Sequence, residues 1–372
     1  MLRKKTLIIA PVQASSCEPG ETSTRIQLEK PRKWPPSEVE QLGAMNILRF
    51  FRSVYSDNRL RVDSRRRPIV DVARYAANRV LSVRERQLTA LHRIPGAPII
   101  FIVGVPRSGT TLLYQLMAKH LDVVYVTNEV ARYWLAPLWA FRRNETETPI
   151  DLRSHLGRSE GTAAPHEFGW FWEHHAPLES LHHRVGAELD VFDWDSIRAE
   201  LEGIAGWSGR PLVLKSLVAV DYHISQFARE LRGASFIRIE RDPRFTAQSL
   251  LEARRKRYGD ERTWWSIRPR DVDAWLDRVP AEQVAHQIGD VSRHIEAGLA
   301  ALPSERWLSL RYENLVADPA KEIERVAGFA RVSMRNMTGG AQTKLRDANV
   351  VRVAPEEFAV IEAALRGEGL LR

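Results

Sequence analysis

The sequence predicts an α/β fold in which a central parallel sheet is flanked by helices. Three observations support this fold class. From Pro98 onward, apolar runs rich in β-branched residues alternate with amphipathic stretches of helical length. Strands joined by helices of this length form right-handed parallel crossovers. The first apolar run ends in a turn framed by Gly104 and Gly109, and a helical pattern follows this turn directly.

The expected elements follow one another in a regular order. The first strand, PIIFIVGV, is continuously apolar, which is typical of a strand buried on both faces. The expected strands are 98–105, 122–127, 210–217, 234–243 and 305–315. The expected helices are 109–120, 220–233, 244–258, 281–302 and 318–331.

Two further regions are added to this alternation. Residues 1–95 are expected to form an N-terminal arm and helices that pack on the core, with helical periodicity at 37–55 and 69–94. The remainder, 96–372, is expected as the main domain. Within it, the stretch at about 130–208 holds six tryptophans and few strand signals, which indicates a helical insertion. We expect it at the carboxyl ends of the strands, where open parallel sheets bind ligands.

The composition favours a cytoplasmic protein with an acidic ligand. The 372 residues include 55 basic and 47 acidic side chains, and the net charge is +8. The arginine run at 63–68 lacks interleaved aromatic residues, so no nucleic acid is expected. A single cysteine excludes a disulfide framework within the chain. No apolar run approaches the roughly 20 residues that cross a bilayer, so no transmembrane segment is expected. The arginine bias suggests a bacterial source.

The turn at 104–111 has the glycine spacing of a P-loop but lacks its lysine. The lysine position holds Thr110. In triphosphate enzymes that lysine neutralises the β and γ phosphates, and a carboxylate at a strand end helps to hold Mg²⁺. We find no convincing carboxylate of this kind, whereas Arg107, Thr110 and Thr111 offer a positive charge and two hydroxyls. The loop therefore predicts a shorter anionic tail without a γ-phosphate, and no metal.

Three segments resemble the sulfotransferases that use 3'-phosphoadenosine 5'-phosphosulfate (PAPS). PRSGTTLL resembles their 5'-phosphosulfate-binding loop, and IRIERDPRFTAQSLL is similar to their 3'-phosphate-binding element. In the second segment, Arg241 and Ser249 have the family's spacing of eight residues. LRYENLVADP resembles the late strand of the family, where Tyr312 would approach the nucleotide. The resemblance covers about 98–332 and is closest to the bacterial and tyrosylprotein branch.

The resemblance implies a set of contacts to the donor. The implied donor-binding residues are Pro106, Arg107, Ser108, Gly109, Thr110, Thr111, Arg241, Ser249 and Tyr312. Arg107 and Lys215 would also be catalytic, with Lys215 at the bridging or leaving oxygen. Apart from the resemblance, Arg241 follows a buried-looking strand, where its guanidinium can fork onto a phosphate. Lys344 or Arg346 would close over the nucleotide.

The residue that takes the acceptor proton has more than one candidate. The arylsulfotransferase branch keeps a histidine two residues after the lysine, but here that position is Leu217. The tyrosylprotein branch uses a glutamate that Glu129 matches with an offset of one residue. His166 and Glu167, which lie beside aromatic residues, are the alternative base or the substrate contacts.

The predicted function is transfer of the sulfuryl group of PAPS to a hydroxyl acceptor, with release of adenosine 3',5'-bisphosphate. The acceptor would be the hydroxyl of a small molecule, a lipid, a sugar or a peptide. A P-loop small-molecule kinase is an alternative, although the absent lysine argues against it. A catalytically inactive nucleotide-binding scaffold is another. The oligomeric state stays open.

Overall fold

The described part of the chain begins at the long helix that precedes the sheet. The computed structural model describes residues 68–143, 152, 154–155, 158–176, 192–335 and 345–371. The predicted arm, with its helix at 37–55, lies outside the described residues. The division of the chain near residue 95 therefore stays a prediction.

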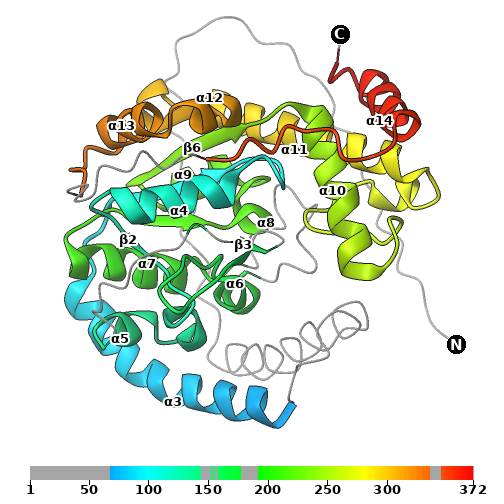
Figure 1. The fold of residues 1–372 in the computed structure, drawn as a ribbon. Helices are drawn as coiled ribbons and strands as arrows, with labels where there is room; N and C mark the ends of the chain where they lie inside the picture. Colours follow the sequence, from blue (N-terminus) through cyan, green and yellow to red (C-terminus); the bar gives the residue numbers. More distant parts are fainter. Residues whose placement is uncertain are drawn as a thin grey trace, which may run out of the picture. The chain divides into compact units, whose positions relative to one another are not determined.

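A five-stranded parallel sheet forms the centre of the fold (Figure 1). Its strands, in spatial order, are β2 (Val124–Tyr125), β5 (Leu212–Lys215), β1 (Ile99–Val103), β6 (Ala234–Glu240) and β7 (Trp307–Arg311). Each neighbouring pair is parallel. The predicted α/β class, with a parallel sheet flanked by helices, is confirmed. All five expected strands are present, although the second is only two residues long.

The helices bear out most of the expected order. Those before β5 are α3 (Pro68–His92), α4 (Thr110–His120), η1 (Val130–Tyr133), α5 (Pro137–Phe141), α6 (Gly169–His175) and α7 (Trp194–Ser208). Those after β5 are α8 (Leu217–Val220), α9 (Ile224–Glu230), α10 (Pro243–Tyr258), η4 (Val272–Trp275), α11 (Pro280–Ala300), η5 (Ser304–Arg306), α12 (Tyr312–Ala317), α13 (Pro319–Ala330) and α14 (Pro355–Gly367).

Two local predictions differ from the structure. The last strand was expected to continue to residue 315, but β7 ends at Arg311 and Tyr312 begins α12. Helical spacing there buries Tyr312 and Leu315 on the same side, which an extended strand would not do. The insertion is mostly helical as expected, but it also contains an antiparallel pair, β3 (Ser154–His155) and β4 (Arg158–Ser159).

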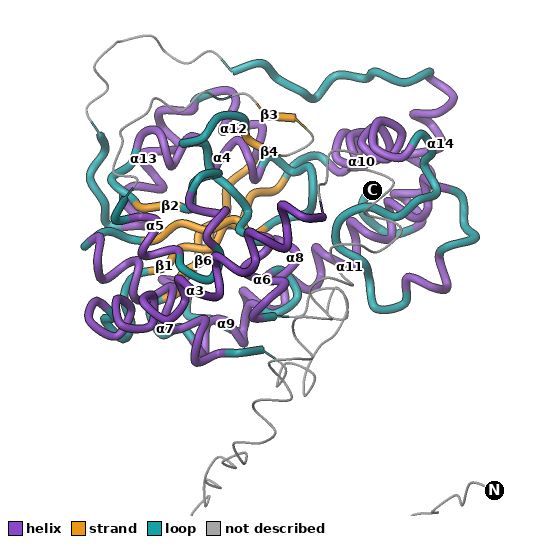
Figure 2. Tube along the Cα trace, turned by 90° about the horizontal axis from the view of Figure 1, so that it is seen from below, coloured by secondary structure: helices purple, strands orange, loops and turns teal. Residues whose placement is uncertain are grey.

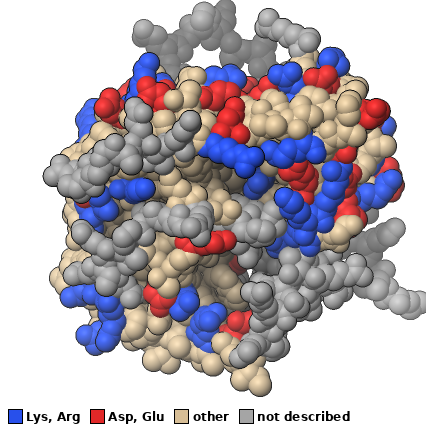
Figure 3. Space-filling view, in the orientation of Figure 1, with Lys and Arg blue, Asp and Glu red and all other residues tan. Residues whose placement is uncertain are grey.

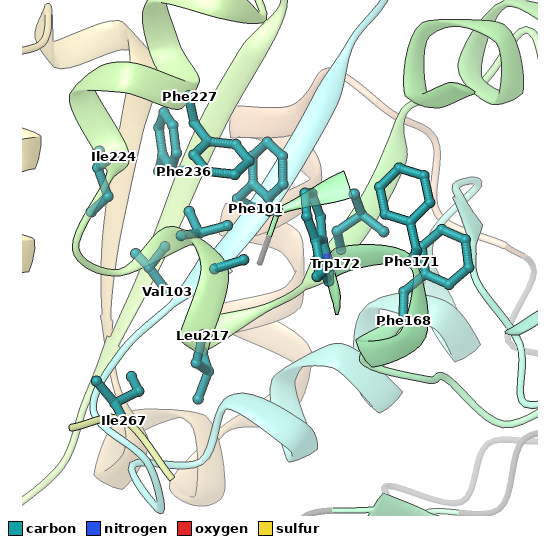
Figure 4. Packing of buried hydrophobic residues seen from close by; sticks show 14 of the residues in the cluster. Phe101, Val103, Phe168, Phe171, Trp172, Leu217, Ile224, Phe227, Phe236 and Ile267 are labelled. Atoms are coloured by element: carbon teal, nitrogen blue, oxygen red, sulfur yellow. The ribbon is translucent and has the colours of Figure 1, made fainter. Parts of the chain in front are cut away.

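Strand β1 is buried on both faces because helices cover the sheet on each side. Its residues alternate between two apolar clusters, so Phe101 and Val103 join one cluster while Ile100 and Ile102 join the other. Phe101 lies 5.2 Å from the ring of Phe227 in the first cluster (Figure 4). The continuous apolar run seen in the sequence is thus the signature of a central strand.

The tryptophans of the insertion contribute mainly to the core. Trp134 and Trp172 are almost fully buried, and the ring of Trp172 lies 5.6 Å from that of Phe227 (Figure 4). The other four pack against the same cluster while partly exposed, namely Trp139, Trp170, Trp194 and Trp207. The insertion is therefore anchored to the sheet and can hold side chains in fixed positions.

Helices α10, α11 and α14 form a group beside the sheet (Figure 2). The segment 345–354 runs from the side of α12 to α14 as a loop (Figure 2). It is fixed to α10 by Gln248, whose side chain donates to Val350 O (3.0 Å) and accepts from Arg352 N (2.9 Å). The chain after residue 345 thus returns to the carboxyl edge of the sheet.

Candidate functional site

The glycine-framed turn lies between β1 and α4, at the carboxyl edge of the sheet. Arg107 has a positive φ of 75°, which is uncommon for a residue with a side chain. Gly109 has φ 105°, and a Cβ there would lie 2.6 Å from the ring of Tyr312. No side chain caps the start of α4 after Gly109. The turn therefore presents backbone N–H groups and the positive end of a helix, a combination that binds anions.

The turn after β1 and the turn after β6 are joined by their arginines. Arg107 Nε donates to Ser249 Oγ (3.0 Å), and Arg241 Nη1 donates to Arg107 O (3.0 Å). The predicted spacing of Arg241 and Ser249 thus places both beside the loop. Strands β1 and β6 are parallel neighbours, so their carboxyl ends meet at the same edge.

Residues of the late segments complete the surroundings of Arg241. Its Nη2 donates to Ala348 O (2.8 Å), and its Nε donates to Asn349 Oδ1 (2.7 Å). The guanidinium carbon lies 4.6 Å from the ring centre of Tyr312, whose hydroxyl accepts from Ala348 N (3.1 Å). Tyr312 thus lies against Arg241, although it belongs to a helix and not to the expected strand.

Three arginines gather at this edge of the sheet. Burial lowers the pKa of Arg107, and the nearby positive charges of Arg241 and Arg352 lower it further. Burial is also the main cause that lowers the pKa of Arg241. Cations held close together repel one another and lower one another's pKa. An anion that binds between them relieves this repulsion. Basic side chains also border the hollow in the middle of the face shown in Figure 3.

Sequence reasoning did not identify Arg352. It pairs with Glu252 through Nε (2.8 Å) and also donates to Ala348 O (3.1 Å). The expected covering residues were Lys344, which lies outside the described residues, and Arg346, which is exposed. Because Arg352 lies 100 or more positions from its neighbours on α10, no local pattern could have indicated it.

Lys215 is enclosed at the end of β5. Its side chain is only 3% exposed, its Nζ donates to Thr111 Oγ1 (2.8 Å), and it forms an ion pair with Glu167. β5 is the parallel neighbour of β1, and residue 215 is opposite Ile102 in that register. The structure therefore brings together the lysine, a hydroxyl of the loop and one of the two alternative base residues.

The backbone around Glu167 is held by buried polar contacts. Trp172 Nε1 donates to Ser216 Oγ (2.7 Å), and Ser216 Oγ donates to Glu167 O (3.3 Å). The preceding His166 accepts from Phe168 N at Nδ1 (2.9 Å), so the neutral ring carries its proton on Nε2. In this tautomer His166 carries a hydrogen-bond donor at Nε2.

Glu129 lies at the start of η1, and its carboxylate forms an ion pair with Arg132 (2.8 Å). Its backbone N–H donates to Thr162 O (3.1 Å), which joins this turn to the insertion. The contacts of the two candidate bases therefore differ, because Glu129 is paired with Arg132 and Glu167 with Lys215.

A buried acid lies behind the loop. Asp221 is fully buried at the end of α8. Burial raises the pKa of Asp221 well above its usual range, against the opposing effects of the Gly104 backbone N–H and the charge of Lys215. Burial therefore favours the neutral form of Asp221, which adds no negative charge beneath the glycine-framed turn.

Metal-binding clusters and membrane-spanning helices are both absent from the described residues. No group of three or more histidine, cysteine and acidic residues is arranged there to hold a metal ion. No helix among them has the length and apolar character needed to cross a membrane.

Comparison of the chain with known protein families gives one match. Residues 98–336 match the model described as "Sulfotransferase family". No curated protein matches the chain.

Solved structures similar to this chain are also described as sulfotransferases. Sulfotransferase STF1 from Mycobacterium tuberculosis H37Rv is 13% identical, covers 87% of this chain and 92% of its own, and has a TM-score of 0.49. STF9 from Mycobacterium avium is 14% identical over 90% of this chain and 78% of its own, with a TM-score of 0.45. A sulfotransferase from Alicyclobacillus acidocaldarius is 17% identical over 73% and 94%, with a TM-score of 0.35.

Proposed function

Since this chain belongs to the sulfotransferase family, we propose that it moves the sulfuryl group of PAPS to a hydroxyl acceptor and releases adenosine 3',5'-bisphosphate. One observation carries this proposal. Arg107 of the first loop contacts Ser249, and Arg241 contacts the backbone of the same loop. Two anion-binding elements are therefore adjacent, as a nucleotide with phosphates on both its 5' and 3' positions requires.

The residues of the loop fit the 5' end of such a donor. Ser108 Oγ is buried and lacks a hydrogen-bond partner among the described residues, which is costly unless a ligand satisfies it. Glycine at position 109 lets the backbone approach closely, and Arg107 contributes a positive charge. Pro106, Ser108, Gly109, Thr110 and Thr111 are proposed to surround the 5'-phosphosulfate, and no metal is part of the proposal.

The 3'-phosphate is assigned to Arg241, Ser249 and Arg352. A guanidinium has five N–H groups, and three of those of Arg241 engage protein acceptors. A phosphate would bind through the remaining N–H groups or replace the contact with Asn349. Tyr312 stacks on Arg241 and so fixes the plane of the guanidinium.

The reaction needs an in-line acceptor, a stabilised leaving oxygen and removal of one proton. When bound, PAPS supplies the sulfuryl group and a phosphate as leaving group. The acceptor oxygen forms a bond to sulfur while the bond from sulfur to the 5'-phosphate oxygen breaks. Lys215 and Arg107 are proposed to stabilise the negative charge that develops on this phosphate oxygen.

Glu167 is proposed to accept the proton of the acceptor hydroxyl. Its contact with Lys215 Nζ supports this role. Lys215 is proposed to lie at the leaving oxygen, so a carboxylate beside Lys215 would also be close to the sulfur that the acceptor attacks. About half of its side chain is exposed, so an acceptor can reach it. Glu129 remains the second candidate, but its partner is Arg132 of η1 and not the lysine proposed to lie at the leaving oxygen.

The donor assignment is tested by thermal melting with adenosine 3',5'-bisphosphate, AMP and ADP. A ligand at about 100 times its Kd stabilises the folded state by about 2.7 kcal/mol. We expect a clear rise in Tm with the bisphosphate, little with AMP, and loss of this preference in Arg241→Ala. Arg278→Ala, which removes an exposed arginine, serves as the control and should behave as the wild type.

Three results would contradict the proposal. Equal rises in Tm with the bisphosphate and with AMP would contradict the assignment of PAPS as the donor. A Mg²⁺-dependent preference for ATP would support the kinase alternative instead, and tight bisphosphate binding without transfer to any acceptor would support an inactive scaffold.

A further inference from the structure

A cavity of about 160 Å³ opens between α3, η1 and α6, next to the proposed reaction centre. Its lining consists of Arg74, Asn128, Ala131, Arg132, Trp134, His166 and Trp170. The volume corresponds to about five water molecules at liquid density. It therefore suits a single ring or a small head group.

The cavity is adjacent to the proposed base. His166 lines it, and the next residue, Glu167, contacts Lys215 at the end of β5. His166 N also donates to Val126 O (2.8 Å), which fixes this segment beside β2. A ligand held here would lie one residue away from the group that is proposed to take the acceptor proton.

The charged residues of the lining are both arginines. Arg74 comes from α3 and Arg132 from η1, and no carboxylate belongs to the lining among the residues that the structure describes. Each arginine pairs with an acid three positions away, Arg74 with Asp71 (3.7 Å) and Arg132 with Glu129 (2.8 Å). These acids lie outside the lining and pair with the guanidinium groups. An arginine side chain can only donate hydrogen bonds, so both arginines offer the cavity donors and no acceptors.

Asn78 connects the backbones of the two arginines. Its Nδ2 donates to Arg132 O (3.0 Å) and to Arg74 O (3.0 Å), and its Oδ1 accepts from Leu135 N (3.0 Å). Asn78 is almost fully buried. The elements that carry Arg74 and Arg132 are thus joined to each other through their backbones.

The remaining lining adds a donor and an aromatic wall. His166 carries its proton on Nε2, as its Nδ1 contact requires. Trp134 and Trp170 lie with ring centres 5.0 Å apart and cover one side. Two cations and a neutral N–H donor beside indole rings favour a ligand with an anionic group on an aromatic or apolar body.

We propose that this cavity binds the anionic group of the acceptor, so that the substrate is a hydroxyl compound that also carries a carboxylate or a comparable anion. The proposal rests on the proposed sulfuryl transfer, because that reaction makes the neighbouring site an acceptor site. The anion is held by Arg74 and Arg132, and the apolar body lies against Trp134 and Trp170.

The test uses three probes that share a 4-hydroxyphenyl ring. They are 4-hydroxyphenylacetate, which is an anion, tyrosol, which is neutral, and tyramine, which is a cation. Their Kd values are measured by titration calorimetry with the full chain and without a donor. We expect 4-hydroxyphenylacetate to bind about tenfold or more tightly than tyrosol, since charge-assisted hydrogen bonds exceed neutral ones.

Variants assign the preference to the two arginines. Arg74→Gln and Arg132→Gln should each weaken binding of the anionic probe, and the double variant should bind the anionic and neutral probes equally. Arg86→Gln removes an exposed arginine of α3 outside the lining and should bind like the wild type. Arg74→Glu should reverse the order in favour of tyramine.

Three outcomes would overturn the inference. They are equal binding of all three probes, binding of none of them at millimolar concentration, and a preference that survives in the double variant. Because these titrations need no donor, an absent response to adenosine 3',5'-bisphosphate would count against the proposed function and leave the anion preference measurable.

Discussion

Among single residues, Lys215 has the most enclosed charge of the proposed site. A buried ammonium is costly unless it is paired, and here Glu167 and Thr111 provide the partners. The neutral form of Asp221, favoured by its burial, leaves the positive charge of Lys215 directed towards the loop. This arrangement holds the positive charge of Lys215 at the position where negative charge would develop on the leaving oxygen.

Substitution of Lys215 should therefore affect turnover more than donor binding. We expect Lys215→Met to lower kcat by about 10²–10³-fold, the usual effect of losing one group that stabilises developing charge. The Kd for adenosine 3',5'-bisphosphate should change little, because Arg107 and Arg241 remain. The measurement is bisphosphate release from PAPS with a phenol acceptor. Lys256→Met, at an exposed position of α10, is the matched control. A variant with unchanged kcat and weakened binding would assign Lys215 to binding alone.

The two acidic candidates can be separated by the same assay. Glu167→Gln should lower kcat by about 10²–10⁴-fold, the range expected for loss of a general base. Glu129→Gln should stay within a few fold of the wild type, since its carboxylate is paired with Arg132. The reverse order would make Glu129 the base, in agreement with its match to the tyrosylprotein branch.

Among single residues, the sequence indicated those whose partners lie a short and fixed number of positions away along the chain. Arg241 and Ser249 were found because eight residues separate them on one turn and helix. Arg352 and the tautomer of His166 depend on contacts made only after folding. The choice between Glu129 and Glu167 likewise depends on their ion-pair partners, which a linear pattern does not contain.

At the scale of elements, the anion loop is shaped by α12 as well as by its own glycines. The ring of Tyr312 would lie 2.6 Å from a Cβ at position 109, which is too close for a side chain there. The same ring stacks on Arg241, so one side chain connects the first loop, the turn after β6 and α12. The close approach at Gly109 therefore links the two proposed phosphate sites.

We expect Gly109→Ala to weaken binding of adenosine 3',5'-bisphosphate by about tenfold or more, because overpacking typically costs about 1–3 kcal/mol. The positive φ adds a further cost of about 1–2 kcal/mol. Gly259→Ala is a matched control, since Gly259 also has a positive φ but has open space around it. The control should lower Tm without changing the bisphosphate Kd. Equal loss of affinity in both variants would mean that strain alone, and not the contact with Tyr312, explains the effect.

The elements themselves were largely predictable because their patterns are local. The apolar run of β1 and the helical periodicity of α10 both correspond to observed elements. The end of β7 was placed wrongly because the apolar run Trp307–Leu310 leads into Tyr312 without a turn signal, although the spacing of Tyr312 and Leu315 fits a helix and not a strand. Packing against the core selected the helix.

At the scale of the whole molecule, α3 is joined to the insertion through a buried pair of acids. The Glu85 carboxylate accepts from Leu138 N (2.6 Å) and Trp139 N (2.8 Å) at the start of α5. Burial raises the pKa of Glu200, and the neighbouring charge of Glu85 raises it further. The protonated form of Glu200, which burial and the charge of Glu85 favour, donates a hydrogen bond to Glu85. This contact joins α3, α5 and α7, and the same helix α3 carries Arg74 to the cavity.

This pair should make stability depend on pH. A carboxyl group with a raised folded-state pKa contributes stability that is fully present below its unfolded pKa, which is near 4.5, and is lost as the pH rises through the higher folded-state value. Glu200→Gln should mimic the protonated acid, because its amide can donate to Glu85 at every pH. We expect the variant to gain about 1–3 kcal/mol over the wild type at alkaline pH and to lose this advantage near pH 4.5. Urea unfolding of both proteins across this range measures the difference. A difference that does not change with pH would show that the proton on Glu200 plays no part in joining the insertion to α3.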